Sequence, residues 1–186
     1  MTDYDFIKTY LEDLSLKLKP NKEIIQKLIL VRDLLLETNK KNKKILIFGN
    51  GGSSAISSHF SVDLTKNAKL RCLNFSDADH ITCFANDYGF EHIFSRQIEA
   101  LGRENDCVVG ISTSGMSTNI MNGVNSAKRK GIKTIALLGK GGGSIKEICD
   151  LSVVVDSNST ARIQEVHITI GHILCDLIEK KLKLNS

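Results

Sequence analysis

The chain has 186 residues, of which 41% are hydrophobic and 25% are charged, and this size and composition suit one compact domain with a sizeable core. Its apolar runs fall short of the roughly 18 residues that a membrane-spanning helix requires, and its acidic N-terminus is unlike a signal peptide, so we expect a cytoplasmic protein without membrane contact. The formal net charge of +4 is concentrated in lysines of the first 44 residues, but no aromatic side chains alternate with them to stack on bases, so nucleic acid is not an expected partner.

Apolar residues at helical spacing predict two N-terminal helices, over residues 3–19 and 21–40, with Pro20 between them. We interpret residues 1–43 as a helical extension of an α/β core over residues 44–186, within a single domain that spans residues 1–186. These two helices have too little partner surface within one layer of the sandwich to bury their apolar stripes. We therefore expect part of them to pack against another subunit in a homo-oligomer.

From residue 44 onward, apolar runs of strand length alternate with segments of helical periodicity. This alternation predicts an α/β fold, a three-layer αβα sandwich with a five-stranded parallel sheet. The predicted strands are residues 44–48, 70–74, 106–111, 132–137 and 151–155. The predicted helical segments are residues 53–66, 77–85, 89–101, 117–130, 139–148 and 161–182, of which 139–148 opens with a Gly-rich loop.

Two of the predicted strands run into similar Gly/Ser turns, each followed by a helix, in KILIFGNGGSSAISS at 44–58 and DCVVGISTSGMS at 106–117. Helix starts offer free N–H groups to anions, and hydroxyl groups add further donors, so the second turn predicts a phosphate cradle. An ordinary Ser-rich helix cap is the alternative. The hydroxyl-bearing residues of this second loop (residues 112–117) are Ser112, Thr113, Ser114 and Ser117.

The first loop (residues 50–53) comprises Asn50, Gly51, Gly52 and Ser53, and these residues are expected to contact the rest of the ligand from the neighbouring strand end. A further Gly-rich stretch, GKGGGS at 139–144, is interpreted as a turn rather than as another anion site, because most such runs after a strand simply permit positive φ.

Side chains suited to proton transfer or metal binding lie on the predicted helices. His59 and Asp63 are one turn apart, so their side chains can converge. Gln164 and His172 are eight residues apart on the last helix, and both can reach a broad cleft if that helix crosses its mouth. The other histidines are interpreted as surface or packed residues: His80, His92 and His167. The widely spaced cysteines, without a C-x-x-C pair, are interpreted as reduced core residues: Cys72, Cys83, Cys107, Cys149 and Cys175.

Four ordered stretches resemble bacterial phosphoheptose isomerases of the sugar isomerase (SIS) domain family: FGNGGSS at 48–54, ANDYGFEHIFSRQIEALG at 85–102, GISTSGMS at 110–117, and ARIQEVH at 161–167 followed by His172. The resemblance runs over nearly the whole chain. It implies a flavodoxin-like sandwich, a homotetramer, and conversion of D-sedoheptulose 7-phosphate, a phosphorylated seven-carbon sugar, to D-glycero-D-manno-heptose 7-phosphate. The product would serve bacterial heptose synthesis for lipopolysaccharide, capsule or nucleotide-heptose precursors.

The resemblance also implies roles for particular residues. Positions that match His59, Asp63, Gln164 and His172 form the family's metal and catalytic cluster, with one zinc ion per subunit as the expected cofactor. Asp63 and His172 are the expected proton-transferring residues of an aldose–ketose isomerase, and Gln164 is also an expected substrate contact. Asn86 and Asp87 match the family's substrate-contacting turn, although this pair is equally an ordinary turn signal.

Three positions depart from the family pattern. Where the family has a glutamate, this chain has Asp63, and a catalytic group that falls about 1 Å short can cost around a hundredfold in rate. Asn67 stands where heptose isomerases often have arginine, and Ala161 stands where some members have aspartate. These departures leave a related ketose phosphate open as the substrate.

Two alternatives to an enzyme follow from the same resemblance. One is a non-catalytic SIS-fold protein that binds a phosphosugar or associates with the bacterial replication initiator; such relatives lose the acid and base residues, whereas His59 and His172 are present here. The other is a phosphosugar sensor, but the sequence contains no helix-turn-helix segment, so its DNA-binding module would have to be a separate chain.

Overall fold

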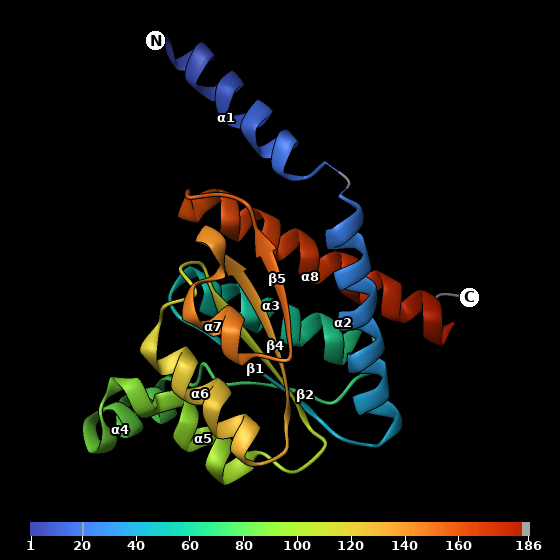
Figure 1. Cartoon of the computed structure of the whole chain (residues 1–186), viewed down its shortest axis with the longest axis vertical. Coiled ribbons are helices and arrows are strands. Elements are labelled where there is room, and N and C mark those ends of the chain that lie inside the picture. Colours follow the sequence, from blue (N-terminus) through green and yellow to red (C-terminus); the bar gives the residue numbers. More distant parts are fainter. Residues whose placement is uncertain (20, 184–186) are drawn as a thin grey trace.

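The computed structural model describes residues 1–19 and 21–183, and its centre is a five-stranded parallel sheet with the strand order β2-β1-β3-β4-β5 (Figure 1). The predicted α/β fold class is confirmed, while Pro20 lies outside the described residues. The strands are β1 (Ile45–Gly49), β2 (Cys72–Asn74), β3 (Cys107–Ser112), β4 (Lys133–Gly139) and β5 (Leu151–Val155).

The helices begin and end close to the predicted residues, with one difference. The helix expected over 77–85 continues to Tyr88, and the segment expected over 89–101 begins with a 3-10 turn, because Gly89 at φ 89° breaks the helical path. The helices are α1 (Asp3–Lys17), α2 (Lys22–Lys40), α3 (Gly52–Lys66), α4 (Ala78–Tyr88), η1 (Phe90–His92), α5 (Ile93–Leu101), α6 (Thr118–Arg129), η2 (Lys140–Gly142), α7 (Gly143–Ile148) and α8 (Thr160–Leu182).

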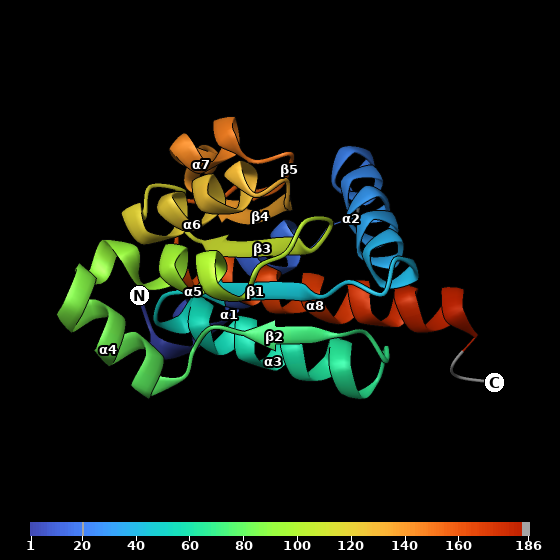
Figure 2. The same cartoon turned by 90° about the horizontal axis from the view of Figure 1, so that it is seen from below.

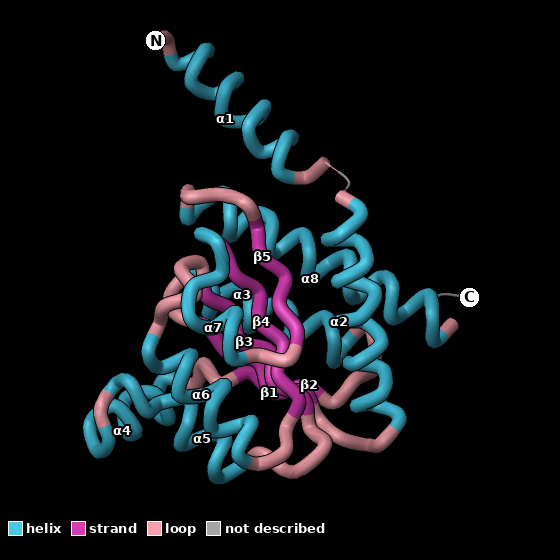
Figure 3. Tube along the Cα trace, viewed as in Figure 1, coloured by secondary structure: helices cyan, strands magenta, loops and turns pink. Residues whose placement is uncertain are grey.

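The central strands are buried on both faces, and successive side chains enter different layers. Ile45 and Ile47 pack with α2, α3 and α8, whereas Leu46 and Phe48 pack with α5, α6 and α7. Figures 2 and 3 show the sheet between these two groups of helices. This two-sided burial explains why the strands read as unbroken apolar runs.

The strand order places a topological switch between β1 and β3. These strands are neighbours in register, with Gly49 opposite Ile111, but the chain leaves β1 through α3 on one face and leaves β3 through α6 on the other. In open parallel sheets, ligands bind in the crevice beyond the carboxyl ends of the strands at such a switch point. The first and second loops both begin there.

Helix α1 projects away from the core (Figure 1) and contains no buried residue. It is held to α8 by polar side chains: the Tyr10 hydroxyl donates to Glu165 Oε1 at 2.6 Å, and the Arg162 guanidinium lies 3.3 Å from the centre of the Tyr10 ring. Apolar side chains on the rest of α1 are exposed, among them Tyr4, Ile7 and Leu11. In residues 1–19 and 21–183, no helix has both the length and the hydrophobicity needed to cross a membrane.

All five cysteines are free thiols. Cys107 and Cys175 are buried, and burial raises the pKa of the Cys72 thiol to about 12, which suits unreactive core thiols. The expectation of a core position is wrong for Cys83, which is exposed on α4, because this helix packs on η1 and α5 and contains no buried residue.

His167 is the buried histidine of α8. Its Nε2 lies 3.1 Å from the carbonyl oxygen of Leu138 on β4, and its Nδ1 has no hydrogen-bond partner. Burial lowers the pKa of His167 to about 4, since a charged imidazole would lose its hydration there.

This pKa shift predicts acid sensitivity. The folded pKa lies below the usual value of about 6.5, so the unfolded chain binds the proton more readily, and stability falls as the pH drops from about 6.5 toward 4. By pH 4 the loss attributable to His167 is about 3 kcal/mol. Urea unfolding between pH 7 and pH 4 should therefore show a weaker pH dependence for His167→Gln, which cannot titrate, than for the unmodified protein. The control His80→Gln, at an exposed histidine, should retain the original pH dependence.

Candidate active site

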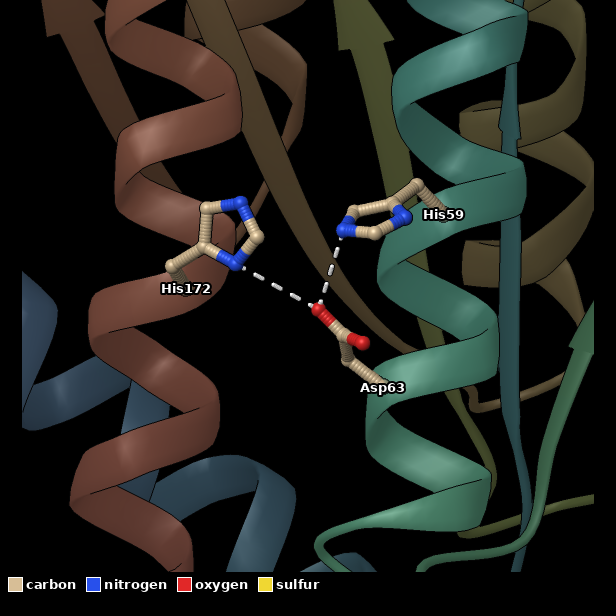
Figure 4. A group of neighbouring side chains, drawn as sticks. All are labelled: His59, Asp63 and His172. Carbon is tan, nitrogen blue, oxygen red and sulfur yellow. Dashed lines mark ion pairs between the residues drawn. The ribbon is translucent and has the colours of Figure 1, made fainter.

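Three side chains suited to metal binding and proton transfer meet between α3 and α8 (Figure 4). His59 Nε2 lies 3.3 Å from Asp63 Oδ2, and His172 Nδ1 lies 3.4 Å from the same oxygen. His59 and Asp63 share one face of α3 because they are one helical turn apart, and His172 comes from α8, which packs alongside α3. The predicted convergence of these three residues is found in the structure.

Exposure differs within this group. The side chain of Asp63 is 15% exposed, whereas those of His59 and His172 are 50% and 53% exposed. The carboxylate therefore lies beneath two imidazoles that remain open to solvent and to a ligand. Although aspartate is one methylene shorter than glutamate, its carboxylate here reaches both imidazoles.

The donor set fits a divalent zinc ion. One ligand atom from each of the three residues lies within 4.8 Å of the others. Two imidazole nitrogens and one carboxylate oxygen are ordinary zinc ligands, and these three leave room in the coordination shell for a further ligand.

Gln164 lies near the start of this helix pair. Its side-chain amide lies against Gly52, where a Cβ atom on the glycine would be 2.5 Å from Gln164 Nε2. A side chain at Gly52 would therefore displace the end of the Gln164 side chain from this position. The structure thus brings Gln164, a predicted metal ligand and substrate contact, against the first loop.

The second loop is a network of hydroxyl and backbone groups. The Oγ atoms of Ser112 and Ser117 are 3.2 Å apart, and the N–H of Gly115 donates to Ser112 Oγ at 3.1 Å. Ser117 is the N-cap of α6 but makes no side-chain cap hydrogen bond. Helix α3 likewise starts without a side-chain cap, at Gly51. Two uncapped helix starts therefore flank the switch point, where their N–H groups can bind an anion.

The Gly-rich stretch after β4 forms a turn, as predicted, and it also supports the second loop. Gly115 has φ +65°, and a Cβ atom there would lie 1.9 Å from the carbonyl oxygen of Gly142. The N–H of Ile145 donates to the Gly115 carbonyl at 3.0 Å. The shape of the second loop thus depends on a segment that follows the next strand.

Asn119 is a polar residue of this region that the sequence reasoning missed. It is 3% exposed, and its side chain forms reciprocal amide hydrogen bonds with Asn50, at 2.8 and 2.9 Å. An asparagine near a helix start is so common that its sequence position gives no signal of this pairing.

The remaining predicted site residues lie apart from this group. Asn86 and Asp87 are exposed at the end of α4, and Asn86 Nδ2 donates to Asp87 Oδ1 at 2.8 Å. Helix α4 packs on η1 and α5. The interpretation of His80 and His92 as surface residues is confirmed, since about half of each side chain is exposed.

Comparison with known proteins agrees with this fold. The family profile described as SIS domain matches residues 9–139. Phosphoheptose isomerase from Trichlorobacter lovleyi is 45% identical over 184 residues, which cover 95% of this chain and 94% of that protein. The structure of phosphoheptose isomerase GmhA from Neisseria gonorrhoeae superposes with a TM-score of 0.92 at 35% identity, covering 96% of this chain and all of that one.

A phosphoheptose isomerase from Francisella tularensis gives a TM-score of 0.89 at 34% identity, covering 97% of this chain and 100% of that one. The chain belongs to the SIS domain family. Within that family, the predicted resemblance to phosphoheptose isomerases is confirmed.

The support of the second loop by Gly142 predicts different outcomes for two glycine substitutions. Gly115→Ala and Gly141→Ala both place an alanine at positive φ, which costs about 1 kcal/mol, but only Gly115 also has a backbone atom in the way. Gly115→Ala should therefore lower the free energy of unfolding further and weaken inorganic phosphate binding about tenfold or more. Gly141→Ala should leave phosphate binding unchanged. Calorimetric titration with phosphate measures this difference, and equal affinities in the two variants would contradict a role for Gly142 in shaping the loop.

Proposed function

We propose that this protein is a sugar-phosphate isomerase that converts D-sedoheptulose 7-phosphate to D-glycero-D-manno-heptose 7-phosphate. The observation that carries the proposal is the meeting of His59, Asp63 and His172 between α3 and α8, in a chain whose relatives are named phosphoheptose isomerases. A non-catalytic binding protein would have no need for this acid–base group.

The second loop binds the phosphate group in this proposal. The hydroxyls of Ser112, Thr113, Ser114 and Ser117 and the N–H groups at the start of α6 supply neutral donors for a dianion. The first loop and Gln164 contact the sugar hydroxyls from the start of α3. Asn86 and Asp87 are proposed as further substrate contacts, as the family resemblance implies.

The reaction moves one proton between two carbon atoms. A base removes a proton from C1 of the ketose to form an enediol, and the same proton, or one from solvent, returns to C2, while the C1 hydroxyl becomes an aldehyde and the C2 carbonyl becomes a hydroxyl. We assign the removal and return of the carbon-bound proton to the carboxylate of Asp63. His172, whose Nδ1 lies 3.4 Å from Asp63 Oδ2, exchanges protons with the sugar oxygens.

One zinc ion per subunit is the proposed cofactor, held by His59, Asp63 and His172, with Gln164 as the further ligand that the family implies. When bound, the ion supplies a Lewis acid for the sugar oxygens. His172 and His59 must be neutral to hold it.

We further propose a cytoplasmic homotetramer whose product enters lipopolysaccharide, capsule or nucleotide-heptose synthesis. The exposed apolar residues of α1 support assembly with other subunits, and the five free thiols are typical of a reducing compartment.

Metal dependence is the first prediction of this proposal. Purified protein analysed for metal should turn over sedoheptulose 7-phosphate, lose that activity on chelation, and recover it when zinc is restored. A folded protein that binds the sugar phosphate but shows no turnover with zinc or other divalent metals would contradict the isomerase assignment and favour a binding role.

Removal of the proposed proton-transferring imidazole should greatly reduce kcat. His172→Ala should lower kcat by at least about a hundredfold, the usual contribution of a general acid or base. The thermal unfolding temperature should change little, because this side chain is 53% exposed. His92→Ala, at a histidine on the opposite side of the sheet, is the matched control and should retain full activity. A wild-type rate for His172→Ala would show the assignment to be wrong.

A further inference from the structure

A pair of asparagine side chains joins the two loops of the site. Asn50 Nδ2 donates to Asn119 Oδ1 at 2.8 Å, and Asn119 Nδ2 donates to Asn50 Oδ1 at 2.9 Å. Asn50 belongs to the first loop, directly after β1, and Asn119 lies at the start of α6, directly after the second loop. We call these two residues the amide pair.

The amide pair lies beyond the carboxyl ends of two neighbouring strands. It bridges the switch point between β1 and β3, where helices α3 and α6 diverge to opposite faces of the sheet. At this point the two strands are no longer paired with each other, because their register ends at Gly49 and Ile111. The amide pair therefore continues the link between β1 and β3 beyond the sheet and into the proposed substrate site.

We infer that Asn119 is a positioning residue that orients Asn50 and fixes the first loop against the second through the amide pair. This inference rests on the proposed function, in which the first loop contacts the sugar and the second loop binds phosphate. It adds a residue that acts through Asn50 rather than on the substrate.

The hydrogen-bonding capacity of the two amides supports this division of roles. Asn119 Oδ1 accepts from Asn50 Nδ2 and also from the N–H of Ile120 at 2.9 Å, so both of its lone pairs are used. For Asn50, the amide pair uses one of two N–H groups and one of two lone pairs. Asn50 therefore keeps one donor and one acceptor, which is the combination that a sugar hydroxyl can satisfy.

The reciprocal geometry also fixes the direction in which Asn50 points. If the Asn50 amide turned over, its oxygen would face the Asn119 oxygen and its NH2 group would face the other NH2 group, and both hydrogen bonds would be lost. Burial of Asn119, at 3% exposure, makes such a loss expensive because water cannot replace the bonds. The first loop is thereby presented to the ligand in one orientation.

A double-mutant cycle tests this inference. The variants are Asn50→Ala, Asn119→Ala and the double variant, with Asn119→Ser as a second substitution that still allows a hydroxyl to accept from Ile120 but is too short for the amide pair. Asn125→Ala, at an exposed asparagine of the same helix, is the matched control. For each protein, kcat and KM for sedoheptulose 7-phosphate are measured, together with calorimetric binding of the same sugar phosphate and of inorganic phosphate.

The expected result has two parts. Asn119→Ala and Asn119→Ser should each lower kcat/KM about tenfold or more, while the double variant should be no worse than Asn50→Ala, because residues that act as a unit are not additive. Inorganic phosphate, which reports on the second loop alone, should bind within about twofold of the unmodified protein, since a twofold change is only about 0.4 kcal/mol. Asn125→Ala should match the unmodified protein in every measurement.

Three outcomes would overturn the inference. Wild-type kcat/KM in both Asn119 variants would do so, as would an additive loss in the double variant. An equal loss of inorganic phosphate binding would show that the substitutions disturb α6 itself rather than the orientation of Asn50.

Failure of the proposed function gives a different pattern. In that case the unmodified protein does not turn over the sugar phosphate. The same double-mutant cycle is then evaluated with the dissociation constants for sedoheptulose 7-phosphate in place of kcat/KM. If the unmodified protein binds neither ligand, the two loops form no such site and the inference falls with the proposed function.

Discussion

The topological switch between β1 and β3 is the constraint on which the rest of the site depends. Because these strands are adjacent and parallel, their carboxyl ends meet at one edge, yet the helices that follow them must lie on opposite faces of the sheet. Two uncapped helix starts, at Gly51 and Ser117, therefore flank a single crevice. The amide pair spans this crevice, and the turn at Gly142 supports its far side. In the proposed function, the phosphate is bound by backbone groups and hydroxyls, without an arginine.

The candidate active site also requires that α3 and α8 pack against each other. Near the start of α3, the amide of Gln164 occupies the space beside Gly52 that a side chain there would fill. Farther along the same pair, Asp63 lies under both His59 and His172. The shorter carboxylate of aspartate reaches His59 one turn away on α3, and it reaches His172 because α8 packs against α3. The chemistry of the site and the packing of the core are therefore parts of one arrangement, since both helices also bury their apolar faces against the sheet.

The two N-terminal helices contribute unequally to this core. Helix α2 contributes Leu28, Val31 and Leu35 to the hydrophobic layer that it shares with α3 and α8, whereas α1 contributes no buried residue. Helix α1 is held by polar and aromatic contacts of Tyr10 with Arg162 and Glu165, and these residues lie on the first turns of α8, next to Gln164. Any subunit that packs against α1 would therefore contact a helix that is itself held to α8, which carries His172.

The sequence by itself determined the elements and much of the chemistry. Apolar runs of strand length identified the strands, most clearly the buried β1, β3 and β4, and the helical spacing of His59 and Asp63 identified a shared face, because both signals are local. The sequence did not determine that His172 reaches the same carboxylate oxygen, that Gln164 lies on Gly52, or that Asn50 pairs with Asn119. The residues of the amide pair are 69 positions apart, so no local periodicity links them. Only the tertiary structure decided these contacts, because they depend on how close two helices approach and on which strand ends become neighbours.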